Sequence, residues 1–104
     1  MTLGELIQEL KKEPADKLVR CGFGKPHSYR GYYEDLAFEP CENTTAWEML
    51  AYAESALGKT FGGYKGGDYV MTASTDVWIS EYGEASNEQI NRYALAFMLG
   101  RSEP

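Results

Sequence analysis

The side chains best suited to chemistry gather in one short segment, residues 24–33. Four hydrogen-bond donors are interspersed there with three tyrosines, two glycines and a proline. Glycine and proline favour an irregular loop, in which donors can converge on one point. Arginine grips a phosphate or carboxylate through two parallel hydrogen bonds, and tyrosine rings stack on bases and sugars. The pattern predicts a pocket for a small anionic ligand, formed by Lys25, His27, Ser28, Tyr29, Arg30, Tyr32 and Tyr33.

The same segment also has a purely structural interpretation. In that interpretation it is a hairpin loop, and His27 and Arg30 are paired with carboxylates that follow closely, at Glu34, Asp35 or Glu39. The sequence leaves both interpretations open.

A second glycine-rich segment, residues 62–67, contains Tyr64 and Lys65. Free backbone amides in such a loop can form a nest for an anion, so we add both side chains to the predicted ligand site. An ordinary connecting loop is the alternative. The nearby triplet 58–60 is not a P-loop, because that motif needs a glycine where this chain has Ala53.

Catalysis and metal binding have weaker support. His27 is the only histidine, and the sequence has neither the ligand spacing of a zinc site nor a nucleophile elbow. We therefore predict no catalytic residue, no metal ligand and no cofactor. A small phosphodiesterase-like hydrolase that uses His27 stays as an alternative.

The charge of the chain is acidic but uneven. The formal net charge at pH 7 is −6, although six of the ten basic residues lie between positions 11 and 30. Phosphate contacts need clustered Lys and Arg, so we expect no direct binding of DNA or RNA. The acidity leaves a second alternative: a protein–protein inhibitor that imitates nucleic acid and occupies the basic groove of a host nuclease.

Length and apolar patterning predict one domain over residues 1–104. No apolar run approaches the roughly 18 residues of a transmembrane helix, and no leader pattern occurs, so we expect a cytoplasmic protein without a membrane segment. Cys21 and Cys41 could pair in principle. Without a secretory signal, we expect reduced and partly buried thiols.

Three helices are predicted from capping boxes and apolar spacing. We expect Trp47 and Trp78 to be core anchors. One face of the last helix is predicted to carry Ile90, Tyr93, Ala94 and Phe97. The start and stop signals are Thr2 and Pro14 for the first helix, Thr45 and Leu57 with Gly58 for the second, and residues 86–89 with Gly100 for the third.

Five short strands complete the prediction, and the last two of them form a hairpin. The element order α-β-β-β-α-β-β-α predicts an α+β fold with a short antiparallel sheet packed against helices. The predicted strands cover residues 17–23, 29–33, 36–38, 69–72 and 76–82.

Five sequence blocks resemble, in the same order, a group of small bacteriophage-encoded proteins of unassigned function. The resemblance spans most of residues 1–100 but carries no activity and no catalytic residue. It implies a phage accessory protein expressed in an infected bacterial host. The blocks are GFGKPHSYRGYY (22–33), LAFEP (36–40), ALGKTF (56–61), YKGG (64–67) and TDVW (75–78).

Small phage accessory proteins often antagonise host defence, and by analogy the resemblance implies such a role. We therefore expect an antagonist that binds and sequesters a small anionic signalling ligand, such as a cyclic or ADP-ribose-type nucleotide. Because 104 residues provide few walls, we also expect a homo-oligomer that encloses the ligand.

Overall fold

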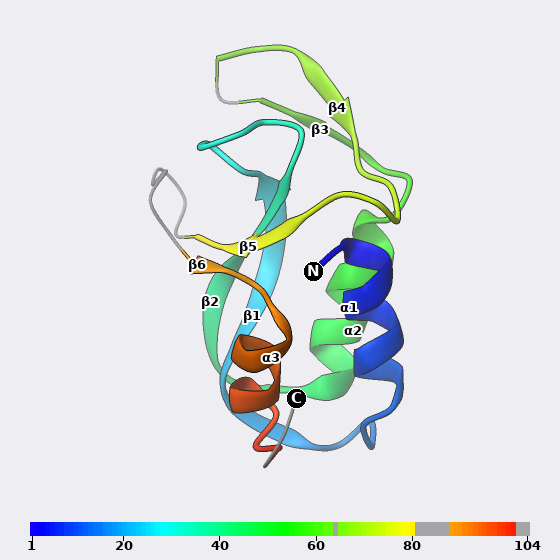
Figure 1. Ribbon diagram of the computed structural model, residues 1–104, viewed down its shortest axis with the longest axis vertical. Coiled ribbons are helices and arrows are strands. Elements are labelled where there is room, and N and C mark those ends of the chain that lie inside the picture. Colours follow the sequence, from blue (N-terminus) through cyan, green and yellow to red (C-terminus); the bar gives the residue numbers. More distant parts are fainter. Residues whose placement is uncertain (64, 81–87, 102–104) are drawn as a thin grey trace.

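Three helices and six strands make up the part of the chain that the computed structural model describes, residues 1–63, 65–80 and 88–101 (Figure 1). The predicted α+β class is confirmed. In chain order the elements are α1 (Leu3–Lys11), β1 (Leu18–Ser28), β2 (Leu36–Thr45), α2 (Ala46–Ala56), β3 (Thr60–Gly62), β4 (Asp68–Val70), β5 (Val77–Ile79), β6 (Glu88–Gln89) and α3 (Arg92–Met98).

Two long antiparallel strands, β1 and β2, form the frame of the fold. Their register runs from Leu18↔Thr45 to Ser28↔Leu36, with a shift between Phe23 and Pro26. β5 pairs with the first part of β2 in parallel, and β6 follows, so the sheet order is β1-β2-β5-β6. β3 and β4 form a separate two-stranded sheet at the end of the molecule away from α3 (Figure 1).

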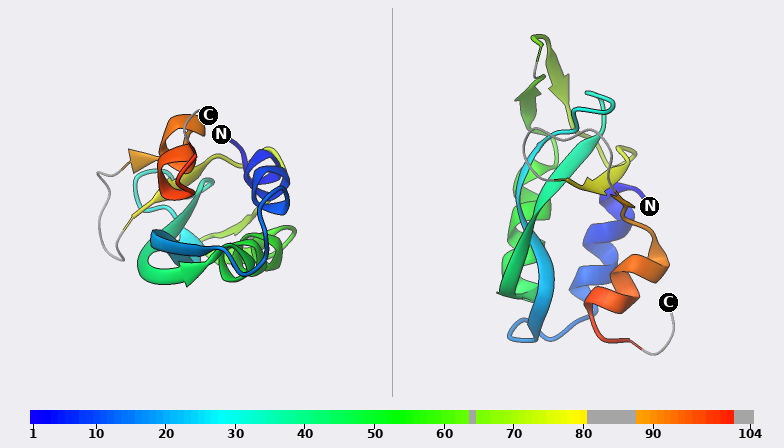
Figure 2. Two further views of the ribbon diagram at one scale, coloured as in Figure 1. Left: turned by 90° about the horizontal axis from the view of Figure 1, so that it is seen from below. Right: turned by 90° about the vertical axis from the view of Figure 1, so that its left-hand side faces the viewer.

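The core lies between the β1–β2 ribbon and the three helices, which surround it in the view from below (Figure 2). The first helix forms as predicted, because Thr2 and Glu5 complete a capping box and four apolar side chains share its buried face. The largest fully buried side chains are Phe23, Phe38, Leu3, Leu6, Leu10, Leu36, Met49, Met71, Ile90, Leu95, Leu99 and Val19.

The first strand is longer than predicted, and the predicted strand over residues 29–33 is wrong. β1 continues through Ser28, so residues 24–28 belong to the sheet and not to a loop. Pro26 is tolerated there because β1 is an edge strand. Residues 29–35 form a tight connection instead, in which the N–H of Tyr32 donates to Tyr29 O and that of Asp35 to Tyr32 O.

The predicted hairpin between residues 69–72 and 76–82 is also wrong, and residues 81–82 lie outside the described part of the chain. β4 pairs with β3, because Gly66 and Gly67 adopt positive φ and reverse the chain between them. The segment after β4 then crosses the start of α1, where Leu3 N–H donates to Thr75 O. This crossing brings β5 to β2 in parallel.

The burial of the second and third helices differs from the prediction. α2 buries alanines and Met49, while the Trp47 side chain is 62% exposed, so Trp47 is not a core anchor. α3 begins after an Asn91 cap, because Glu88 and Gln89 form β6; Ser86 and Asn87 lie outside the described residues. Leu95 and Ala96 face the core, whereas Tyr93 and Phe97, which were predicted to share one apolar face with Ile90, are exposed.

None of the helices in the described ranges is long and apolar enough to cross a membrane.

Candidate functional site

The predicted ligand segment lies where β1 passes through the 29–35 connection into β2. Its inner side is an aromatic anchor. The Tyr29 ring is only 4% exposed and stacks on Trp78 at 4.5 Å between ring centroids. The Trp78 indole N–H donates to Asp35 Oδ2 at 3.0 Å. Tyr29 therefore holds the connection to β5 and is not placed to stack on a ligand.

The anchor also perturbs the carboxyl of Asp35. Burial raises the pKa of this carboxyl above its ordinary value, while the hydrogen bond from Trp78 opposes the rise. The acidic side chains of Asp76 and Glu34 add to the rise. The proton is thus held more tightly on Asp35 in the folded protein than in the unfolded chain.

His27 and Ser28 make internal contacts. The His27 ring nitrogens lie 3.0 Å from Ser28 O and 3.3 Å from Ser80 O. The buried Ser28 hydroxyl donates to Tyr33 O at 2.7 Å, which closes the connection from inside. These two side chains are positioned to hold the loop, which favours the structural interpretation for this part of the segment.

The outer side of the connection forms a hollow of about 330 Å³, which we call the tyrosine cleft. Tyr33 and Tyr69 meet edge to face, with ring centroids 5.9 Å apart. Tyr32 is 56% exposed, and its hydroxyl donates to Glu34 Oε2 at 2.8 Å. That hydrogen bond raises the pKa of the Tyr32 phenol above its ordinary value. The cleft is lined by Arg30, Gly31, Tyr32, Tyr33, Glu34 and Tyr69.

The tyrosine cleft joins the two segments that the sequence analysis treated separately. A Cβ on Gly63 would lie 2.9 Å from both the Tyr33 and Tyr69 rings, so the glycine-rich connection packs directly against this tyrosine pair. Exposed Lys25 and Lys65 do not line the cleft, and Tyr64 lies outside the described residues.

Three residues that line the cleft, Gly31, Glu34 and Tyr69, are not among the predicted ligand residues. For Tyr69, the available signal was its position two residues after the glycine-rich segment. The β3–β4 pairing needed to bring it back toward Tyr33 was not predicted.

The electrostatic surroundings of the cleft are acidic on one side. A neighbouring hollow of about 420 Å³ shares Glu34 and Tyr69 with the cleft and adds Asp35 and Asp68. Arg30 is the cation that lines the cleft. A ligand with several phosphates would therefore meet repulsion, whereas one negative group beside Arg30 fits the charge.

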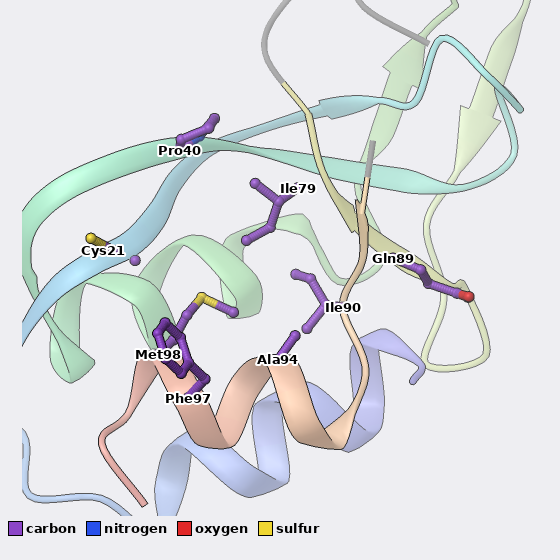
Figure 3. Close-up of a pocket in the computed structure, with 9 residues that line it drawn as sticks. Cys21, Pro40, Ile79, Gln89, Ile90, Ala94, Phe97 and Met98 are labelled. Atoms are coloured by element: carbon purple, nitrogen blue, oxygen red, sulfur yellow. The ribbon is translucent and has the colours of Figure 1, made fainter. Parts of the chain in front are cut away.

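A second, apolar hollow of about 450 Å³ lies between α3 and the sheet (Figure 3). Ile79, Ile90 and Met98 point into the same space, and Cys21 and Phe97 contribute to its walls. Its lining is apolar apart from Gln89 and the Cys21 thiol. This hollow has no counterpart in the sequence predictions.

The two cysteines are free, and the sheet register keeps them apart. Cys21 is opposite Glu42, and Cys41 is opposite Gly22. Side chains of directly opposed residues share a face and successive residues alternate, so the two thiols point to opposite faces of the sheet. An intrachain disulfide would require a change of register.

No cluster of three or more His, Cys, Asp or Glu side chains suitable for a metal ion occurs among the residues that the structure describes. No known protein family, curated protein or solved structure matches this chain. The proposals below therefore rest on geometry and on the resemblance described above.

Proposed function

We propose that this chain is a non-catalytic binding protein whose ligand is a small nucleotide-type anion held in the tyrosine cleft. The observation that supports this is the convergence of Arg30 with three tyrosine rings, from two separate segments, on one hollow of about 330 Å³. That volume lies at the lower end of the range of small-molecule sites. Tyrosine rings offer planar surface to a base, and the guanidinium offers paired donors to a phosphate.

The charge around the cleft narrows the ligand class. Arg30 is opposed by Glu34 in the cleft and by Asp35 and Asp68 beside it. A cyclic mononucleotide carries a single phosphodiester charge, whereas ADP-ribose carries two phosphate charges close together. We therefore rank a cyclic mononucleotide above an ADP-ribose-type ligand.

The cleft is shallow, because Gly31, Tyr32 and Glu34 are all exposed. One copy would leave much of a bound nucleotide in contact with water. We therefore propose a homo-oligomer in which a second copy covers the ligand. In the phage context implied by the sequence resemblance, such enclosure would remove a nucleotide signal from the host and antagonise its defence.

Isothermal titration calorimetry with cyclic AMP, cyclic GMP and ADP-ribose tests this proposal. Arg30→Gln should weaken binding by about tenfold or more, the loss expected for a charged hydrogen bond. Tyr33→Ala should also weaken it, through the lost stacking. Tyr52→Ala, a partly exposed tyrosine on α2, is the matched control and should bind normally.

The fate of the ligand separates binding from hydrolysis. After denaturation of the complex, chromatography should return the nucleotide intact. Recovery of a cleaved product would instead support the hydrolase alternative. The proposal fails if none of the three nucleotides gives heat, or if the Arg30→Gln variant binds as the parent protein does.

A further inference from the structure

A second surface lies at the other end of the molecule, where α3 packs against β1 (Figure 1). It exposes large apolar side chains: Phe97 is 84% exposed, Tyr93 74% and Leu18 62%. Tyr93 and Phe97 are four residues apart on α3, so they lie one above the other on the same side of the helix. Clustered exposure of this kind marks interaction surfaces more often than scattered single side chains do.

Two hollows adjoin on this surface and give it the form of a groove. The apolar hollow of about 450 Å³ and a second one of about 440 Å³ share Cys21, Phe97 and Met98 as lining residues. Phe97 therefore lines both depressions, each of which has room for a large side chain. We call this the α3 groove. Its shape suits a helix that presents apolar side chains on successive turns.

The charge along the α3 groove is opposite to that of the whole chain. Lys17 and Arg20 line its second hollow, and no carboxylate lines either hollow among the described residues. The chain as a whole carries a formal charge of −6. Two cations at one end of an apolar groove, on an otherwise acidic protein, are complementary to an acidic amphipathic segment.

The same charges disfavour a second copy of this chain in the groove. A two-fold interface would bring the same patch of both copies together, with Lys17 and Arg20 of one copy beside those of the other. An anionic membrane is also disfavoured, because two cations are few against the net charge of −6.

We propose that the α3 groove binds an acidic amphipathic helix of a partner protein. Apolar side chains at helical spacing would occupy the two hollows on either side of Phe97. Asp or Glu side chains on the flank of that helix would pair with Lys17 and Arg20. This interaction is separate from the tyrosine cleft and does not depend on a nucleotide.

Selection from a displayed library of random peptides tests the proposal without knowledge of the partner. Peptides of about 16 residues span roughly four helical turns, enough to cross both hollows. The enriched sequences should be acidic and should repeat apolar residues at helical spacing. Bound peptide should also slow the alkylation of Cys21 by iodoacetamide, measured in a Cys41→Ser background that leaves a single thiol.

Variants of the groove and of distant sites locate the binding. Phe97→Ala should weaken the best selected peptide about 30-fold, the loss typical of a central aromatic anchor. Arg20→Glu should weaken it as well and reduce its salt dependence. Trp47→Ala and Lys11→Glu are the matched controls, because they change an exposed aromatic and an exposed cation elsewhere, and both should bind normally.

Three results would overturn the proposal. The first is a selection that enriches no peptides, or peptides without acidic and helical character. The second is equal binding by the Phe97→Ala variant, whose fold circular dichroism would check. The third is another occupant: a dimer in sedimentation equilibrium that Phe97→Ala dissociates, or Phe97-dependent binding to vesicles of two parts phosphatidylcholine to one part phosphatidylglycerol.

Discussion

The hydrogen bond between Trp78 and Asp35 should fix the connection that carries the tyrosine cleft. Its donor and acceptor are 3.0 Å apart and partly buried, and it links β5 to the end of the 29–35 connection. A hydrogen bond to a charged group contributes about 1.5–3 kcal/mol, and partial exposure of Asp35 reduces this to about 1 kcal/mol. Asp35→Ala should therefore lower the melting temperature by roughly 4–6 °C in a domain of this size.

Asp35→Asn separates the hydrogen bond from the charge. The amide oxygen can still accept from the Trp78 indole, so this variant should be far more stable than Asp35→Ala at neutral pH. It also removes the cost of keeping a charged carboxylate partly buried. We expect its free energy of unfolding at pH 7 to equal or exceed that of the parent protein.

The pH dependence has a definite sign, because burial raises the folded-state pKa of Asp35. The folded state binds the proton more tightly, so ionisation of this carboxyl costs stability at neutral pH. That cost is relieved as the pH falls through the folded pKa toward the unfolded value of about 3.9. Any advantage of Asp35→Asn over the parent should shrink over the same range.

Thermal and urea unfolding followed by fluorescence would measure these differences. A Trp47→Phe background leaves Trp78 as the only tryptophan, so the signal reports the anchor itself. The reasoning fails if Asp35→Ala is as stable as the parent, or if the Asn and Ala variants are destabilised equally. The first result would show that the hydrogen bond does not stabilise the folded protein. The second would show that the loss of stability comes from the lost charge and not from the lost hydrogen bond.

Three further predictions follow from packing and charge. Gly22→Ala should lower the free energy of unfolding by about 1–3 kcal/mol, because the added Cβ would lie 2.7 Å from a buried threonine methyl group. At Gly62 an added Cβ would meet open space, so Gly62→Ala should melt near the temperature of the parent protein. Hydrogen bonds from Lys12 and Arg101 lower the pKa of Glu9, so the stability that these bonds contribute is lost as the pH falls through the folded-state pKa of Glu9. Arg101→Gln should therefore have a lower free energy of unfolding than the parent protein in urea titrations, and this difference should shrink on acidification. Mild oxidation should give no intrachain disulfide by mass spectrometry, because the two cysteines face opposite sides of the sheet.

The helices were predictable where a local signal decides them. Thr2 and Thr45 accept the backbone N–H three residues on, as their capping patterns require, and Gly58 and Gly100 take the left-handed conformation after their helices. The prediction for Trp47 was wrong because α2 packs against the core through its small side chains. Alanines on α2 allow close approach to the neighbouring elements, which a tryptophan there would prevent.

Strand pairing was less predictable because it depends on distant contacts. β5 pairs with β2, which lies about forty residues earlier, so no short turn joins the two strands and signals their pairing. The contacts of the candidate site also depend on residues that are distant in the sequence. His27 and Ser28 can both donate hydrogen bonds, but the sequence does not show that backbone carbonyls would meet them, one of which belongs to Ser80, far along the chain. Tyr69 joins the cleft only through the β3–β4 pairing.

The 29–35 connection divides its side chains between two tasks, and this division is what a binding loop requires. Tyr29 faces inward and stacks on Trp78, with its ring so close to Gly31 that an added Cβ would lie 2.6 Å away. Tyr32 and Arg30 line the outer hollow. Because the inner contacts already order the backbone, a ligand in the cleft would find the connection largely preorganised. The aromatic richness of this segment therefore serves both the anchor and the cleft.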